Sequence, residues 1–163
     1  MRELDHKIRE LLDKEAIKDV LARYAITVDS GDAEGFAELF TPDAVWEWPQ
    51  VDLRYQGRGA LHDLAAAIAD NLPGGQHVMS NHVISVNGDS ATVVCELTCF
   101  ISRPQKIYTV LQGFYRDRLV KINGNWLICR RTVDVRNPEL ITHGEIGDLY
   151  SDLIAALNRE NPS

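Results

Sequence analysis

Apolar residues recur at spacings of three and four over the first part of the chain. From Ile8 to Val28 they form one stripe, and charged residues fill the other side. This pattern predicts a long amphipathic helix. Gly31 suits the residue that ends it, and Asp32 suits the N-cap of a second, shorter helix that buries Phe36.

Helical spacing returns twice later in the chain. Residues 59–72 place their leucines and Ile68 on one face before "PGG" ends the pattern at 73–75, which predicts a third helix. A last apolar pattern predicts a C-terminal helix at about 144–160.

Elsewhere the period of the pattern is two, which is typical of strands. Three long runs are separated by "NGD" and "SRPQ", and "NGN" joins the third run to a fourth as a hairpin. A short aromatic run, "AVWEW", ends at Pro49 and is followed by a predicted loop. The predicted strands are 44–48, 77–86, 90–101, 106–122 and 126–135.

The order of these elements predicts an α+β fold, with helices first, then consecutive antiparallel strands, then a closing helix. We expect a curved, mostly antiparallel sheet wrapped over the N-terminal helices as a cone-shaped barrel with an apolar pocket between the layers. A chain of 163 residues with 45% hydrophobic composition suits a single domain, residues 1–163, with its core at about 8–136.

Charge and composition narrow the classes of partner. The formal net charge of −7 and the lack of clustered lysine and arginine argue against nucleic acid. No run approaches the roughly 20 apolar residues of a membrane span, and the charged N-terminus does not suit a signal peptide, so we expect a cytoplasmic protein without a membrane partner. Cys95, Cys99 and Cys129 lack the spacing of a disulfide framework or a zinc site and suit small core residues.

Asp29 is the first candidate for chemistry. It closes an apolar run, and projection at about 100° per residue places it at the rim of the stripe that contains Tyr24 and Val28. A carboxylate at that position is costly unless a partner pairs with it. The alternative is a turn residue, because "DSGD" is common loop chemistry.

Two histidines lie in the second predicted strand. Strand alternation places Asn81 on the face of His77 and places His82 on the opposite face, so the two imidazoles do not converge on a metal. A structural role is the alternative for a single strand histidine. Alternation also separates Arg130 from Arg131, and an arginine facing the core needs an anion or an aromatic face, or else forms a salt bridge.

Several familiar signatures are missing. The sequence has no nucleophile elbow and no P-loop, and "GRGALH" lacks the third glycine of a dinucleotide fingerprint. A nucleophilic Cys95 or Cys99 needs a polarising neighbour, which the sequence does not suggest.

Four segments carry a resemblance to a known family. They are "IKDVLARYAITVDSGDAEGFAELFTPDAVWEW", "YQGRGAL", "HVMSNHVISVNGDSATV" and "GFYRDRLVKINGNWLICRRTV". Over residues 8–136 the chain resembles the SnoaL-like group of the nuclear transport factor 2-like superfamily, which includes polyketide cyclases, scytalone dehydratase, a hexachlorocyclohexane dehydrochlorinase and relatives of ketosteroid isomerase. This resemblance implies the cystatin-like cone and its pocket.

The resemblance also implies roles for individual residues. Asp29 matches the acidic partner of the dehydratase and dehydrochlorinase branch, and His77 matches its catalytic histidine. Arg131 and Trp46 fall where that branch has pocket residues, and we expect Arg131 to act in catalysis. The expected substrate-binding residues are Tyr24, Trp46, Tyr115 and Asn81.

The expected function is a cofactor-independent lyase or isomerase that takes a proton from a small apolar or aromatic ring-containing substrate, with no metal required. The alternative is a non-catalytic binding protein or the small subunit of an aromatic-ring-hydroxylating dioxygenase. An epoxide hydrolase ranks last, because alternation separates Arg131 from Asp134. Apolar residues on both faces of the strands predict a homo-oligomer, a dimer or trimer, through the outer face of the sheet.

Overall fold

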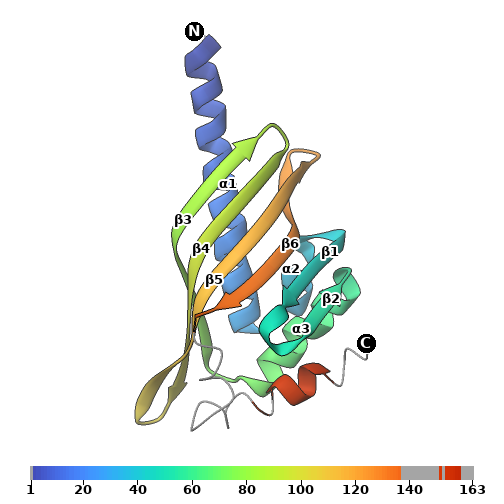
Figure 1. The fold of residues 1–163 in the computed structure, drawn as a ribbon, viewed down its shortest axis with the longest axis vertical. Coiled ribbons are helices and arrows are strands. Elements are labelled where there is room, and N and C mark those ends of the chain that lie inside the picture. Colours follow the sequence, from blue (N-terminus) through green and yellow to red (C-terminus); the bar gives the residue numbers. More distant parts are fainter. Residues whose placement is uncertain (1, 137–150, 152, 159–163) are drawn as a thin grey trace.

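The computed structural model describes residues 2–136, 151 and 153–158. Figure 1 labels the main helices and the strands, which form one sheet. The helices are α1 (Arg2–Ser30), α2 (Ala33–Glu38) and α3 (Arg58–Asn71), with a 3-10 turn η1 (Pro49–Val51). The strands are β1 (Phe40–Trp48), β2 (Leu53–Gln56), β3 (Gly75–Asn87), β4 (Ser90–Arg103), β5 (Lys106–Ile122) and β6 (Asn125–Val135).

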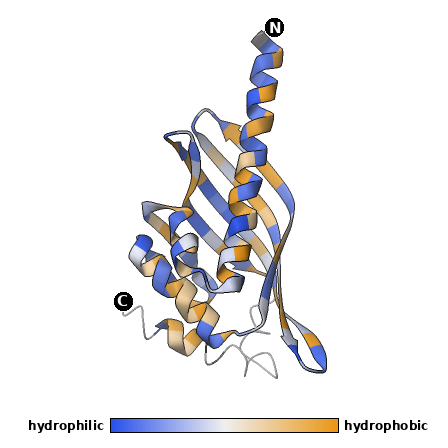
Figure 2. Cartoon of the chain, turned by 180° about the vertical axis from the view of Figure 1, so that it is seen from behind, coloured by the Kyte–Doolittle hydropathy of each residue, from blue (hydrophilic) through white to orange (hydrophobic). Residues whose placement is uncertain are grey.

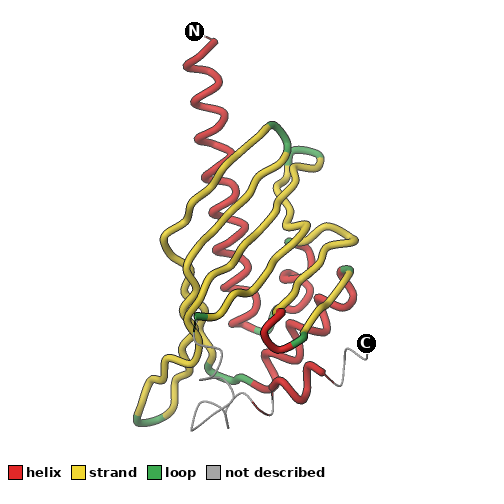
Figure 3. The backbone as a smooth tube through the Cα atoms, in the orientation of Figure 1, coloured by secondary structure: helices red, strands yellow, loops and turns green. Residues whose placement is uncertain are grey.

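The predicted α+β class is confirmed. The six strands form one curved, unclosed sheet in the order β2-β1-β6-β5-β4-β3, and α1 runs across one face of it, as Figure 3 shows. We call the face under α1 the inner face and the opposite face the outer face. Seen from behind in Figure 2, apolar positions gather where α1 and α3 approach the sheet. The core therefore lies between helices and sheet.

The two ends of α2 follow the local chemistry of the sequence. Gly31 has a φ of +74°, a conformation that glycine adopts without strain, and it ends α1. The Asp32 side chain accepts a hydrogen bond from the backbone N–H of Gly35 at 2.9 Å, which makes it the N-cap of α2. Both predictions are confirmed, and together they turn the chain directly after Asp29.

The sheet differs from the predicted run of consecutive antiparallel strands in two ways. Strand β1 begins at Phe40, earlier than expected, and pairs in parallel with β6, as Trp46 does with Arg131. Strand β2, which was predicted to be loop, pairs with β1. Its four residues alternate between buried and exposed, but so short a run gives a weak periodic signal.

The two ends of the described chain differ in how far their apolar residues are buried. The first turns of α1 extend past the sheet in Figure 1, so Ile8, Leu11 and Leu12 are exposed, and the buried stripe begins only at Ile17. At the other end, residues 153–158 are helical and bury Leu153 and Leu157. The rest of the helix predicted at 144–160 lies outside the described residues, apart from residue 151. No helix among the described residues is long and apolar enough to cross a membrane.

Candidate functional site

Asp29 and His77 are in direct contact, although 48 positions separate them in the sequence. Asp29 Oδ1 lies 2.6 Å from His77 Nδ1, and Asp29 Oδ2 accepts a hydrogen bond from the His77 backbone N–H at 2.8 Å. The two bonds hold the carboxylate to both the ring and the backbone of one residue. The imidazole therefore has a fixed orientation, with Nδ1 engaged and Nε2 left for other contacts.

The local fold explains this contact. Asp29 lies in the last turn of α1, just before the Gly31 cap, and His77 lies near the start of β3, just after Gly74, which has a φ of +80°. A hollow of about 140 Å³ lies against both residues and is lined by the two glycine turns. We call it the outer hollow, and it brings solvent-accessible space up to the imidazole.

The environment changes the acidity of His77. Its side chain is only 10% exposed, and this burial by itself lowers the pKa of the imidazole. The neighbouring Cys99 thiol and the hydrogen bond to Asp29 outweigh burial and raise the pKa of His77 well above its ordinary value. A carboxylate beside an imidazole stabilises the imidazolium, so His77 is a stronger base than a free histidine.

Three of the predicted substrate-binding residues form an aromatic cluster beside His77. The Trp46 indole N–H donates a hydrogen bond to the Tyr24 hydroxyl at 3.1 Å, and the rings of Tyr24 and Tyr115 meet edge to face at 5.5 Å. All three side chains are buried. Burial, followed by the nearby Tyr24, raises the pKa of Tyr115 well above its usual value, so its hydroxyl stays protonated.

A small cavity, which we call the inner pocket, lies against this cluster. It measures about 40 Å³ and shares His77, Ile68 and Leu72 with the lining of the outer hollow. Leu153 and Leu157 reach it from the C-terminal helical residues, and the Tyr55 hydroxyl donates a hydrogen bond to the Leu157 carbonyl at 2.7 Å. The full lining is Tyr24, Trp46, Trp48, Ile68, Leu72, His77, Leu97, Cys99, Leu111, Tyr115, Val133, Leu153 and Leu157.

Arg131 lies behind the aromatic cluster and does not line the inner pocket. It is fully buried, and its Nε and Nη2 donate to the two carboxylate oxygens of Asp117 at 2.8 and 2.6 Å. Its guanidinium stacks on Tyr24 at 3.8 Å and on Tyr115 at 4.0 Å. Burial lowers the pKa of Arg131 but Asp117 outweighs it, so the net shift is upward. Arg131 was expected among the pocket residues, but it lies behind the Tyr24 and Tyr115 rings instead of in the pocket lining.

Asn81 lies away from the other candidate residues. The pairing of β3 with β4 shifts register between Ser80 and Val83, and Asn81 has a φ of +51° within this bulge. Its exposed side chain donates to Glu96 Oε2 at 2.6 Å and does not line the inner pocket. The predicted grouping of Asn81 with His77 is wrong, because the extra residue in the bulge breaks strict alternation.

The same bulge places His82 on the inner face with His77, where the sequence predicted opposite faces. His77 and Met79 are half-buried, Ser80 and Asn81 are both exposed, and the alternation of half-buried and exposed residues starts again at His82. Burial and then the charges of Lys18 and Arg131 lower the pKa of His82. Within the described residues, no three His, Cys, Asp or Glu side chains lie close enough together to hold a metal ion.

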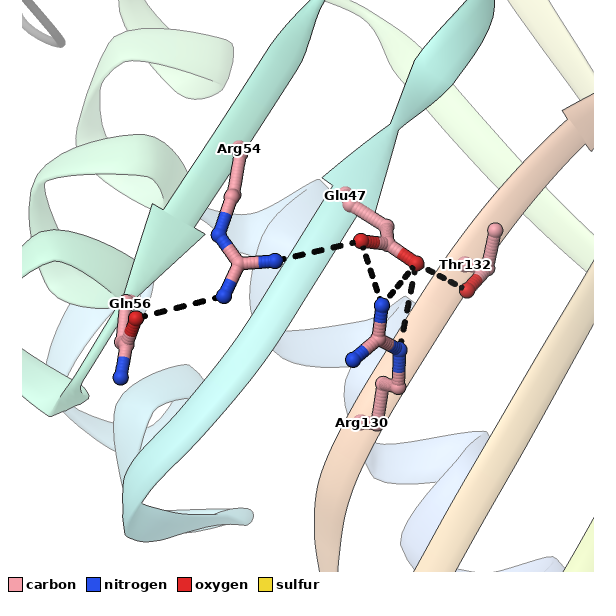
Figure 4. Close-up of polar contacts among 5 residues, drawn as sticks. All are labelled: Glu47, Arg54, Gln56, Arg130 and Thr132. Atoms are coloured by element: carbon pink, nitrogen blue, oxygen red, sulfur yellow. Dashed lines mark hydrogen bonds and ion pairs between the residues drawn. The ribbon is translucent and has the colours of Figure 1, made fainter. Parts of the chain in front are cut away.

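The outer face carries a separate charged cluster, drawn in Figure 4. Glu47 accepts two hydrogen bonds from Arg130 Nη2, at 2.7 and 2.8 Å, and one from Thr132 at 2.8 Å, while Arg54 approaches from β2. Asp134 pairs with Arg116 on this face, so Arg131 and Asp134 do not form the acid and base arrangement of an epoxide hydrolase.

Comparison with known families identifies the group to which this fold and site belong. A family model described as a SnoaL-like domain matches residues 9–132, which is most of the chain. The chain belongs to the SnoaL-like domain family. The resemblance inferred from the sequence is therefore confirmed.

Solved structures agree with this assignment. Rv3472 of Mycobacterium tuberculosis, a protein of unknown function, superposes with a TM-score of 0.83 at 28% identity, covering 96% of this chain and 93% of that one. An NTF2-like protein with a cystatin-like fold from Novosphingobium aromaticivorans gives 0.75 at 26% identity, covering 91% and 96%. A proposed scytalone dehydratase from the same bacterium gives 0.68 at 26% identity, covering 77% and 85%.

Proposed function

We propose that this protein is a cofactor-independent lyase or isomerase in which His77, oriented by Asp29, removes a proton from a small, largely apolar, ring-containing substrate. The observation that carries the proposal is the 2.6 Å contact between Asp29 Oδ1 and His77 Nδ1, at the wall of an apolar pocket. Similarity to a proposed scytalone dehydratase supports the same class of chemistry.

Asp29 fits the role of the residue that prepares the base. Because Nδ1 faces the carboxylate, Nε2 is the nitrogen that takes the proton, and the developing imidazolium is stabilised by the adjacent negative charge. A positioned general base contributes about 10²- to 10⁴-fold in rate. The outer hollow gives the imidazole a path for exchanging its proton with solvent.

Removal of a proton from carbon leaves negative charge on the substrate, and the aromatic cluster supplies donors for it. The Tyr24 hydroxyl already accepts a hydrogen bond from Trp46, which leaves its own proton free to be donated. Arg131 places a full positive charge directly behind the Tyr24 and Tyr115 rings. We propose Arg131 as a positioning residue that holds both rings and favours negative charge in the pocket.

The size of the inner pocket constrains how substrate enters. About 40 Å³ holds a few water molecules, whereas ligand pockets commonly measure about 300–1,000 Å³. Leu153 and Leu157 occupy one side of the space, and they belong to the short C-terminal helical segment. We propose that substrate displaces these two side chains from the pocket, and that the helical segment then covers the bound substrate.

Solvent deuterium exchange tests the proposal without knowledge of the natural substrate. Cyclic ketones with an acidic α-hydrogen are incubated with the protein in D₂O, and loss of the α-proton signal is followed by NMR. We expect His77→Ala and Asp29→Asn each to slow exchange by about 10²- to 10⁴-fold. The rate should rise with pH through the pKa of His77 and then level off, because only the neutral imidazole accepts a proton.

His82→Ala is the matched control, since His82 is a second imidazole on the inner face but lies outside the pocket. It should exchange at the wild-type rate. Full activity of His77→Ala would defeat the proposal. Absence of exchange with every ketone, together with co-purification of a larger iron-bearing protein, would favour the alternative of a non-catalytic dioxygenase subunit.

A further inference from the structure

The Cys99 thiol lies beside the imidazole of His77. In the pairing of β3 with β4, His77 is directly opposite Cys99, and the thiol is near enough to the imidazole to contribute to its raised pKa. Cys99 is a free cysteine, is 2% exposed and lines the inner pocket together with His77. Asp29 engages Nδ1, which leaves Nε2 as the nitrogen that can take the thiol proton. Carboxylate, imidazole and thiol therefore belong to one cluster at the pocket wall.

The other two cysteines differ from Cys99 in their neighbours. Cys95 occupies the same face of the same strand and is equally buried, but its surroundings are the Arg131–Asp117 pair, and burial raises its pKa to about 11. Cys129 lies on the outer side of β6 and donates a hydrogen bond to the Arg118 carbonyl at 3.3 Å. Of the three, Cys99 combines a base, a carboxylate behind that base and a pocket in front of it.

We propose that Cys99 is a nucleophile that adds reversibly to α,β-unsaturated carbonyl compounds in the inner pocket, with His77 as its base. Thiolates, not thiols, attack carbon, and an imidazole backed by a carboxylate is an established means of producing one. The apolar lining selects neutral molecules over charged ones.

The reaction needs no oxidant and no further reactant. The Cys99 proton moves to His77 Nε2, and sulfur forms a bond to the β-carbon. The electron pair of the carbon–carbon double bond shifts towards the carbonyl as an enolate, and the imidazolium returns its proton to the α-carbon. The reverse path begins with removal of that same α-proton by His77, the step proposed above for the lyase or isomerase. The covalent site uses the same imidazole but does not require turnover.

Alkylation of the native protein by acrylamide, a small neutral α,β-unsaturated amide, tests the proposal. Peptide mass spectrometry gives separate rates for Cys95, Cys99 and Cys129, each normalised to its rate in denaturant. At pH 7 we expect Cys99 to react at least about tenfold faster than Cys95, since only Cys99 has an imidazole beside it that can take the thiol proton. Equal rates for these two equally buried thiols would overturn the proposal, and this comparison needs no variant.

A variant then identifies the base. His77→Gln should slow the Cys99 reaction at least about tenfold and leave Cys129 unchanged. An unchanged Cys99 rate in that variant would overturn the role of the imidazole. Cys99→Ser should abolish the adduct, because a serine hydroxyl is a far weaker nucleophile than a thiolate. If Cys99 does not react with acrylamide while deuterium exchange still depends on His77, the covalent site is excluded and the proposed function is not.

Discussion

Arg130 and Arg131 are neighbours in the sequence but form very different ion pairs. Arg131 points to the inner face, where both it and Asp117 have side chains with 0% exposure. Arg130 points to the outer face, where its side chain is 42% exposed and that of its partner Glu47 is 15% exposed. Each pair has close, charge-assisted contacts at 2.6 to 3.2 Å. The difference lies almost entirely in the surroundings.

The comparison teaches what each pair contributes. An outer pair competes with water, and its net worth is small. An inner pair has lost its hydration, so either charge becomes costly when its partner is removed. Arg131 also stacks on Tyr24 and Tyr115, so the inner pair fixes two rings of the pocket. We infer that the pair of Arg131 and Asp117 fixes the arrangement of the site. The pair of Arg130 and Glu47 adds only a small amount to the stability of the sheet.

The largest effect is expected from breaking the inner pair. Arg131→Met leaves Asp117 buried without a partner and should lower the free energy of unfolding by about 3–5 kcal/mol in urea titrations. The double variant Arg131→Met with Asp117→Leu should be more stable than the single one, because no charge is stranded. A loss below about 1 kcal/mol for the single variant would remove the distinction between the two pairs.

The second-largest effect on stability is expected from the contact between Asp29 and His77. The folded pKa of His77 is raised, so the imidazolium contributes stability that is complete below the unfolded pKa of about 6.5 and is lost as pH rises through the folded value. Wild type should therefore lose its advantage over Asp29→Asn as pH rises, by about 1.4 kcal/mol for each unit of the pKa shift that Asp29 supplies. Thermal unfolding across pH 5.5–9 measures it, and a constant difference would contradict it.

Breaking the outer pair should cost less. Glu47→Gln keeps the shape of the side chain and removes the charge facing Arg130, and we expect a loss of at most about 1 kcal/mol. The loss should shrink further in high salt, which screens exposed charges. Urea titrations at low and high salt measure both values. A salt-independent loss comparable to that of Arg131→Met would show that the outer pair behaves as a buried one.

The smallest effect on folding is expected at Val94, a half-buried residue of the outer face. Val94→Lys should change the stability of the single chain by less than about 0.5 kcal/mol. If copies associate through this face, as the apolar outer positions predict, wild type should sediment as a dimer or trimer and the variant as a monomer. Wild type that sediments as a monomer at micromolar concentration would contradict the homo-oligomer prediction.

Much of the fold follows from periodicity. The three helices, the Gly31 and Asp32 signals and the four long strands all have local causes, and the structure confirms them. The parallel pairing of β1 with β6 has no local cause, since it joins residues such as Glu47 and Arg130 that lie 83 positions apart. Such a contact depends on how the whole sheet curves.

The site shows the same division. Contact between Asp29 and His77 was expected from the family resemblance, and separation of Arg130 from Arg131 followed from alternation. Cys99 was missed because of the β3 bulge. At the turn, Asn87 pairs with Ser90, and the same register continued along β3 would place Phe100 opposite His77. The register shifts by one residue between Ser80 and Val83, so Cys99 lies opposite His77 instead. A bulge of this kind has little signature in one sequence.

The pairing of β1 with β6 has a consequence for the growing chain. Phe40–Trp48, with three aromatic residues, is synthesised more than 80 residues before the strand that covers its second edge. Until β6 leaves the ribosome, that edge has no partner strand, and we infer that its open backbone groups can pair with a neighbouring nascent chain.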